Sequence, residues 1–210
     1  MLDYKTVARG GSDEFTVKRS RFIGYAGPVK SNAEASAFIG EIKTAHWDAT
    51  HNVYAYVLRD GQTRRYSDDG EPQGTAGIPA LDVLLKEGLS DCAVVVTRYF
   101  GGVMLGAGGL VRAYSRASKI AVEAAGIVTV KRCVRLVIRC DYGFYGRLPA
   151  AAAESGGVIE ATDFKEDVTI TMHLPVEALA RFEARVTDLS LGRVKCEKKN
   201  EFYAETINNS

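Results

Sequence analysis

The chain has 210 residues, and its 27 Lys and Arg against 26 Asp and Glu give a formal net charge of +1. This balance excludes a protein whose overall charge attracts nucleic acid or an acidic membrane, so anion binding must come from a local patch. The 4 cysteines form no C-x-x-C pair, which is typical of buried thiols in a reducing compartment and not of a disulfide framework or a zinc site.

No apolar run approaches the roughly 18 residues of a membrane span, and the first residues lack the apolar stretch of a signal peptide. We therefore expect a cytoplasmic protein with no membrane partner. The length is comfortable for two domains that each bury a core. A change in the apolar rhythm near Arg132 predicts one domain over residues 1–132 and a second over 133–210, each able to fold independently.

The first half of the chain predicts an α/β arrangement. Ser31 and Glu34 have the spacing of a capping box that starts a helix, and Asp60-Gly61 predicts a turn between two strands. The segment 67–77 is polar and broken by glycine, so we expect a loop there. After a polar lead, strands are expected over 21–29, 52–58, 63–66 and 92–97, and helices from 32 onward, over 79–85 and over 110–126.

The second half follows the order β-α-β-β-α-β. This is the order of the split-βαβ, ferredoxin-like unit, which has one helical face and one open sheet face. Its strands are expected over 134–140, 157–162, 168–174 and 193–197, and its helices over 142–155 and 175–189. The predicted fold class is therefore α+β, with an α/β N-terminal domain and a ferredoxin-like C-terminal domain.

The segment Arg98–Tyr114, RYFGGVMLGAGGLVRAY, places a cluster of glycines between a buried strand and a helix. Such a loop offers unpaired backbone N–H groups and the positive end of the helix dipole, which together favour an anion. The alternative is that the glycines only let the helix pack closely on the sheet. Neither a phosphate-loop nor a dinucleotide fingerprint is present, so no cofactor is predicted. The candidate anion-binding glycines are Gly101, Gly102, Gly106, Gly108 and Gly109.

Basic residues follow on the same helix. Arg112, Arg116 and Lys119 stand at i, i+4 and i+7, so they share one face that begins at the glycine loop. This spacing favours a binding site for a polyanion, and the alternative is a solvated helix face partly paired with Glu123. Arg98, just before the loop, enlarges the same patch if the fold brings it near.

Two histidines flank the expected end of the first helix. His46 and His51 have no other evident partners, so we predict that the polar loop 67–77 packs near both of them. A metal would need a third ligand from this loop, and we predict no metal. A general acid or base role for either histidine stays open, although no nucleophile, base and orienting acid occur together. The candidate acidic partners in the loop are Asp68, Asp69 and Glu71.

Three stretches together resemble the IMPACT family, and in particular its bacterial YigZ-like branch. They are DDGEPQGTAGIP from Asp68 to Pro79, VVTRYFGG from Val95 to Gly102, and LGAGGLVRAY from Leu105 to Tyr114. The resemblance covers nearly the whole chain. It implies an N-terminal domain similar to those of ribosomal and elongation-factor proteins, and a C-terminal domain similar to the last domain of elongation factor G.

The resemblance also implies a link to translation. Eukaryotic members compete for an activator of the kinase that phosphorylates an initiation factor, a pathway that does not extend to a bacterial-type chain. The leading hypothesis is a non-enzymatic cytoplasmic protein that engages RNA or the ribosome through the glycine loop and the basic helix. A protein partner docking on the same loop is one alternative. An enzyme for a phosphorylated or nucleotide substrate, with His46 or His51 as acid or base, is another.

Overall fold

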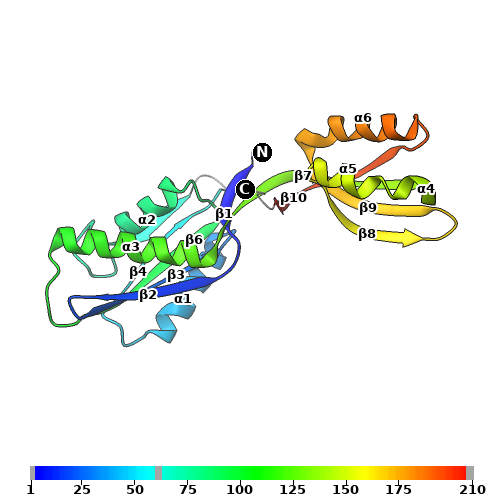
Figure 1. Cartoon of the computed structure of the whole chain (residues 1–210). Helices are drawn as coiled ribbons and strands as arrows, with labels where there is room; N and C mark the ends of the chain where they lie inside the picture. The colour runs from blue at the N-terminus through cyan, green and yellow to red at the C-terminus, as the bar shows by residue number, and fades with distance from the viewer. Residues whose placement is uncertain (1–2, 60–62, 207–210) are drawn as a thin grey trace. The chain divides into compact units, whose positions relative to one another are not determined.

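The computed structural model describes residues 3–59 and 63–206, and these form two compact units (Figure 1). The first unit is Tyr4–Thr129, and the second holds the described residues from Val130 onward together with Asp3. The division lies between Thr129 and Val130, within the long strand β7.

The first unit is built around one antiparallel sheet, with strand order β2-β3-β6-β4-β5. A further strand, β1, is hydrogen-bonded to β7, whose first residues belong to the same unit. The elements are β1 (Tyr4–Val7), β2 (Gly11–Val17), β3 (Ser20–Pro28), α1 (Asn32–Ala45), β4 (His51–Val57), β5 (Arg64–Ser67), α2 (Gly77–Lys86), β6 (Cys92–Tyr99) and α3 (Ala107–Ala125).

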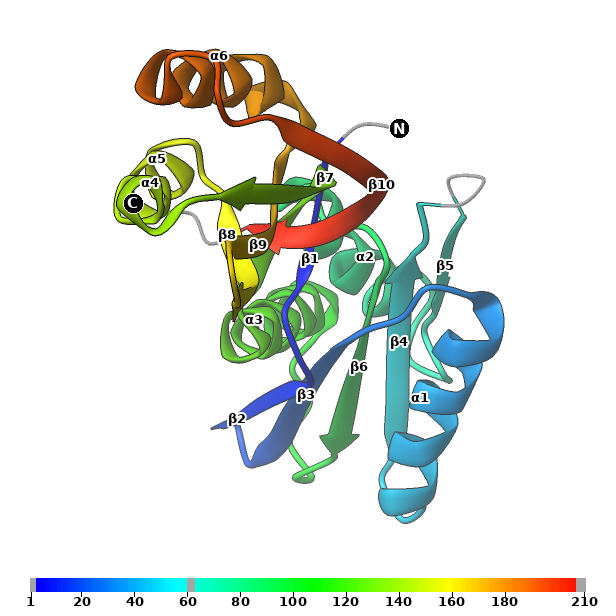
Figure 2. The ribbon, with the colours of Figure 1, turned by 90° about the vertical axis from the view of Figure 1, so that its right-hand side faces the viewer.

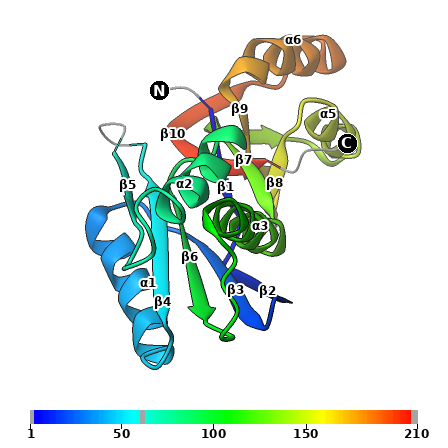
Figure 3. The ribbon, with the colours of Figure 1, turned by 90° about the vertical axis from the view of Figure 1, so that its left-hand side faces the viewer.

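Helices cover both faces of this sheet. Figures 2 and 3 show α1 on one side and α2 with α3 on the other. Along the central strand β6, Val94 and Val96 join the clusters under α2 and α3, whereas Ala93 and Val95 pack with residues of α1. Burial on both faces explains why this strand is a continuous apolar run and not an alternating one.

Most expected elements of this half are confirmed. The strand over 21–29 is β3, and β4 pairs with β5 as the hairpin that was expected, although its turn at Asp60-Gly61 lies outside the described residues. No strand was expected in the polar lead, but β1 and β2 form there. β2 is an edge strand with mostly exposed side chains, so it carries no clear apolar alternation. Gly11 lets α3 approach it, since a Cβ at that position would overlap the backbone of Ala125.

The second unit has the expected order β-α-β-β-α-β. Its sheet runs β10-β7-β9-β8, and Leu136, Ile138, Ile170 and Phe182 are among the side chains of its core. The expected helix over 142–155 is broken in two, with a proline near the start of its second part. The elements are β7 (Ile127–Cys140), α4 (Tyr142–Tyr145), α5 (Leu148–Glu154), β8 (Val158–Phe164), β9 (Val168–Pro175), η2 (Val176–Ala178), α6 (Leu179–Ser190) and β10 (Cys196–Thr206).

Within residues 3–59 and 63–206, no helix combines the length and the apolar character that a membrane crossing requires.

We expect residues 130–210 to fold without the rest of the chain. All members of the core cluster around Leu136 and Phe182 lie between Val134 and Cys196, so the fragment retains its complete apolar core. Expressed alone, it should unfold in one cooperative thermal transition when followed by circular dichroism. A fragment with no cooperative transition would count against an independent domain.

Candidate functional site

The candidate site is at the end of β6, where connections from distant parts of the first unit meet. The β2–β3 turn is joined to the loop after β6 by the Gly101 N–H, which donates to Ser20 Oγ over 3.2 Å. The turn after α1 joins through the Thr50 N–H, which donates to the Arg98 carbonyl over 2.9 Å, and through Thr50 Oγ1, which accepts from the Phe100 N–H over 3.0 Å. These bonds hold the glycine loop in place.

The glycines of the loop have different structural roles. Gly101 serves close packing, because a Cβ there would overlap the carbonyl group of Arg19. Gly106 caps α3 at a φ of +75°, in the left-handed region, and a Cβ on it would meet nothing within 4 Å. The helix begins at Ala107, earlier than expected, so Gly108 and Gly109 lie in its first turn and Gly102 remains in the loop.

The start of α3 is open to an anion. No side chain caps it, and its first turn contains no acidic residue. The first hydrogen bond into the helix is that of the Leu110 N–H to the Gly106 carbonyl, so the N–H groups before Leu110 precede the helical hydrogen-bond pattern. Unpaired N–H groups and the helix dipole together favour negative charge here.

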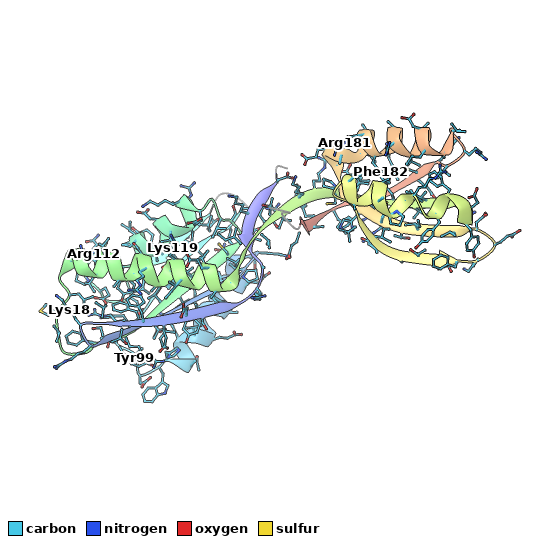
Figure 4. All side chains as sticks on the ribbon, viewed as in Figure 1. Lys18, Tyr99, Arg112, Lys119, Arg181 and Phe182 are labelled. Atoms are coloured by element: carbon cyan, nitrogen blue, oxygen red, sulfur yellow. The ribbon has the colours of Figure 1, made fainter. Side chains whose placement is uncertain are left out.

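The basic stripe that was expected on α3 is exposed. Arg112, Arg116 and Lys119 are exposed and lie outside the buried side of the helix, and Figure 4 shows Arg112 and Lys119 along α3. The Arg116 guanidinium lies 4.3 Å from the centroid of the Phe15 ring, and Lys119 Nζ lies 3.9 Å from a carboxylate oxygen of Glu123. Lys119 is therefore partly paired, as the alternative interpretation expected.

Sequence reasoning missed two further basic residues at this site. Lys18 and Arg19 form the β2–β3 turn with φ angles of +45° and +63°, and both are exposed. The turn packs against Gly101, and Figure 4 shows Lys18 at the Arg112 end of α3. The signal that could have found them is the basic pair itself, which occupies a tight turn between two strands.

Arg98 is not part of the exposed patch, which corrects the expectation. Its side chain is 6% exposed and donates from Nη1 to Glu71 Oε1 over 2.6 Å. The same oxygen accepts the Tyr114 hydroxyl over 2.7 Å, and burial together with this bond holds the pKa of Tyr114 well above its ordinary value. The reason is strand alternation: Arg98 lies on the same face of β6 as Val94 and Val96, beneath α3.

The polar loop packs against His51, as predicted. His51 Nδ1 lies 2.8 Å from the Asp69 carbonyl, and Nε2 lies 3.8 Å from Glu71 Oε1. The prediction was wrong for His46, which contacts the hydroxyls of Tyr25 and Tyr99 at 2.6 and 2.8 Å. Its helix α1 packs on the other face of the sheet, and only Lys43 near the end of α1 is bonded to the loop, through Asp69, in the part of the chain that the structure describes.

The loop acids shape the loop itself. Asp68 accepts backbone N–H bonds from Gly74, Ala76 and Gly77 at 2.8–3.0 Å. Partial burial acts to raise the pKa of Asp68, but these bonds outweigh it and the pKa lies below its ordinary value. Asp69 accepts from Lys43 and from the Asn52 N–H. Across the described ranges, no three His, Cys, Asp or Glu side chains are grouped as metal ligands.

A pocket of about 380 Å³ lies beside this network. Phe100, Met104, Leu105 and Leu110 supply apolar walls, and Gly106 and Ala107 at the start of α3 also line it. Phe100 is 47% exposed and Met104 is 83% exposed, which is unusual for large apolar side chains. Thr50, His51, Glu71 and Arg98 are the polar residues of its lining.

Comparison with known proteins places these features in a family. The model of the Impact N-terminal domain matches residues 18–122, which include the basic turn, the polar loop, the glycine loop and the basic helix. The chain belongs to the IMPACT family. Residues 138–193 match a second model, described as a domain of unknown function, DUF1949.

Bacterial relatives of this IMPACT-family chain match most of its length. The IMPACT family member YvyE of Bacillus subtilis is 36% identical over 203 residues, which are 96% of this chain and 94% of YvyE. YigZ of Escherichia coli is 33% identical, over 85% of this chain and 89% of YigZ. The Protein IMPACT homolog of Dictyostelium discoideum is 35% identical over 43% of this chain and 27% of its own length. A crystal structure of a hypothetical protein has a TM-score of 0.60 and 30% identity, and covers 95% of this chain and 98% of the other.

Proposed function

We propose that this chain is a non-enzymatic protein that acts in translation. It binds RNA or the ribosome through the start of α3 and the basic residues around it. The observation that carries the proposal is the gathering of exposed cations beside an uncapped helix start without a first-turn acid. The exposed cations are Lys18, Arg19, Arg112, Arg116 and Lys119. The link to translation rests on the eukaryotic members of the family and is part of the proposal.

The arrangement suits a chain of phosphates better than a single ion. The turn that carries Lys18 and the stripe that ends at Lys119 lie on different elements, so the charges extend along the surface. Lys and Arg that neutralise successive phosphates release counterions, which supplies sequence-independent affinity. Backbone N–H groups at the start of α3 add a fixed contact for one phosphate.

The salt dependence of RNA binding tests this proposal. If Arg112, Arg116 and Lys119 each neutralise one phosphate, the log–log slope of affinity against salt is roughly −2, and it steepens to about −3.5 if Lys18 and Arg19 also contribute. Arg116→Ala should make the slope shallower by about 0.7. Fluorescence anisotropy with a labelled 10-nucleotide single-stranded RNA measures this, with Arg181→Ala on exposed α6 as the control that leaves the slope unchanged. Absence of binding at low salt would refute the proposal.

A protein partner is the second candidate, and a specific observation favours it. Phe100, Val103 and Met104 are exposed in the loop before α3, and exposed apolar side chains of this kind mark interaction surfaces. A protein that docks there would bury these side chains and would depend little on salt. The salt slope therefore separates the two candidates.

A further inference from the structure

The apolar pocket lies next to the basic surface, and the two together fit one class of ligand. We infer that the pocket beside Phe100 receives an unstacked base of single-stranded RNA, whose phosphates contact the surrounding cations. This inference rests on the proposed function and goes further by naming the form of RNA and the group that is recognised.

The walls of the pocket suit a flat aromatic ring. Phe100 is half exposed. The Arg98 guanidinium carbon lies 5.3 Å from the centroid of its ring, so a cation–π contact with a buried residue stabilises the position of the ring. The side chains of Met104 and Leu105 add apolar surface. A volume of about 380 Å³ lies within the range of sites that hold small organic groups, about 300–1,000 Å³. A base that stacks on an exposed aromatic ring is a common means of binding single strands.

The polar lining offers one hydrogen-bond acceptor to a base. A carbonyl oxygen can only accept, so His51 Nδ1 carries the proton that is donated to Asp69, and in the neutral ring Nε2 keeps a lone pair. Glu71 Oε1 is occupied by Arg98 and Tyr114. His51 Nε2 is therefore one group in the pocket that can accept an N–H from a base, a donor that every RNA base carries.

Charge favours RNA over an apolar protein segment as the occupant. The pocket includes Ala107 at the start of α3, and Arg112 follows on the same helix. On the other side of the loop, Gly101 packs against the turn that carries Lys18 and Arg19. Cations thus lie on the turn that packs against the start of this loop and on the helix that follows it. Aromatic side chains within a basic surface are the combination that binds single strands, since bases stack while phosphates pair with Lys and Arg.

A paired base cannot enter the pocket, because its faces and edges are covered in a duplex. The inference therefore predicts a preference for single strands over a duplex of equal length. Phe100→Ala should weaken binding of single-stranded oligouridylate and oligoadenylate by about 5- to 160-fold, the loss that corresponds to one stacked base. The salt slope should stay the same, because no phosphate contact is removed. Phe100→Trp should retain the affinity, because it keeps a stacking surface.

The experiment uses the full chain, 10-nucleotide oligouridylate and oligoadenylate, an RNA duplex of equal length and an abasic ribose-phosphate oligomer. Phe164→Ala is the matched control, since Phe164 is 53% exposed but lies in the second unit. The inference is supported if Phe100→Ala weakens binding of the single strands and leaves the abasic oligomer and the duplex unaffected.

Other outcomes overturn the inference in distinguishable ways. Single strands that bind the original chain and Phe100→Ala equally well would refute the base pocket and leave the proposed function standing. An equal loss for single strands, duplex and abasic oligomer would show that Phe100 acts through the shape of the loop, which also refutes a base in the pocket. If none of the RNA probes binds at low salt, the proposed function fails together with the inference.

Discussion

Arg112→Glu combined with Arg116→Glu is expected to abolish RNA binding and to leave the melting temperature within a few degrees of the original. Both side chains are exposed on α3, so their replacement removes two phosphate contacts and adds repulsion at the same positions. Exposed charges contribute little to stability. The main cost is the contact of Arg116 with the Phe15 ring, about 0.5–1 kcal/mol for an exposed cation over an aromatic ring.

A matched control separates the site from the total charge. Arg181 and Arg185 stand at i and i+4 on α6 and are exposed, so Arg181→Glu with Arg185→Glu changes the net charge equally, from +1 to −3, since each substitution subtracts two. RNA affinity and thermal unfolding are measured for both double variants. An equal loss of affinity in the two would mean that the overall charge, and not the α3 surface, determines binding. Unchanged RNA binding in the α3 variant would refute RNA binding through this surface and would favour a protein partner.

Arg98→Met is expected to lower the free energy of unfolding by about 3–5 kcal/mol. The side chains of Arg98 and Glu71 are 6% and 3% exposed, so removing the cation leaves a largely buried carboxylate without its counter-charge. The Tyr114 hydroxyl and the Arg98 guanidinium share Glu71 Oε1, and the remaining hydroxyl alone cannot balance a full negative charge. Urea unfolding of the purified variant measures the loss.

Replacing the whole buried network tests the cause of that loss. The triple variant Arg98→Met, Glu71→Leu and Tyr114→Phe removes the charge, its partner and the hydroxyl together, so no buried polar group is left unpaired among them. Replacement of a buried ion pair by apolar groups of similar volume is often neutral, and the triple variant should recover most of the stability. Arg112→Ala, at an exposed position, serves as the control with a change under about 0.5 kcal/mol. A single variant that loses less than about 1 kcal/mol would contradict the buried-charge argument.

The local elements could be predicted because their signals are local. The apolar run of β6, the capping box of α1 and the β-α-β-β-α-β order of the second unit each depend on residues within a few positions of one another. The exposed stripe on α3 followed from helical spacing for the same reason. The edge strand β2 was missed because its exposed residues show no apolar alternation, and its place is decided by pairing with β3 and by contact with α3.

The composition of the site was decided by the tertiary structure. Gly101 and Ser20 are 81 positions apart, and their hydrogen bond places the Lys18 turn beside the glycine loop. Spacing along the chain contains no information on a contact of this kind, because it depends on how β3 pairs with β6.

Arg98 shows most clearly which properties follow from the sequence and which follow from the tertiary structure. Its basic side chain beside the glycine loop was evident from the sequence alone. Arg98 is buried because α3 covers the face of β6 that it occupies. Its guanidinium is paired because Glu71 lies opposite it. The sequence by itself determined most of the elements, the two-unit organisation and the basic helix, since these depend on local periodicity. The tertiary structure alone decided which charges are buried in pairs and which remain exposed, because burial depends on packing between distant segments.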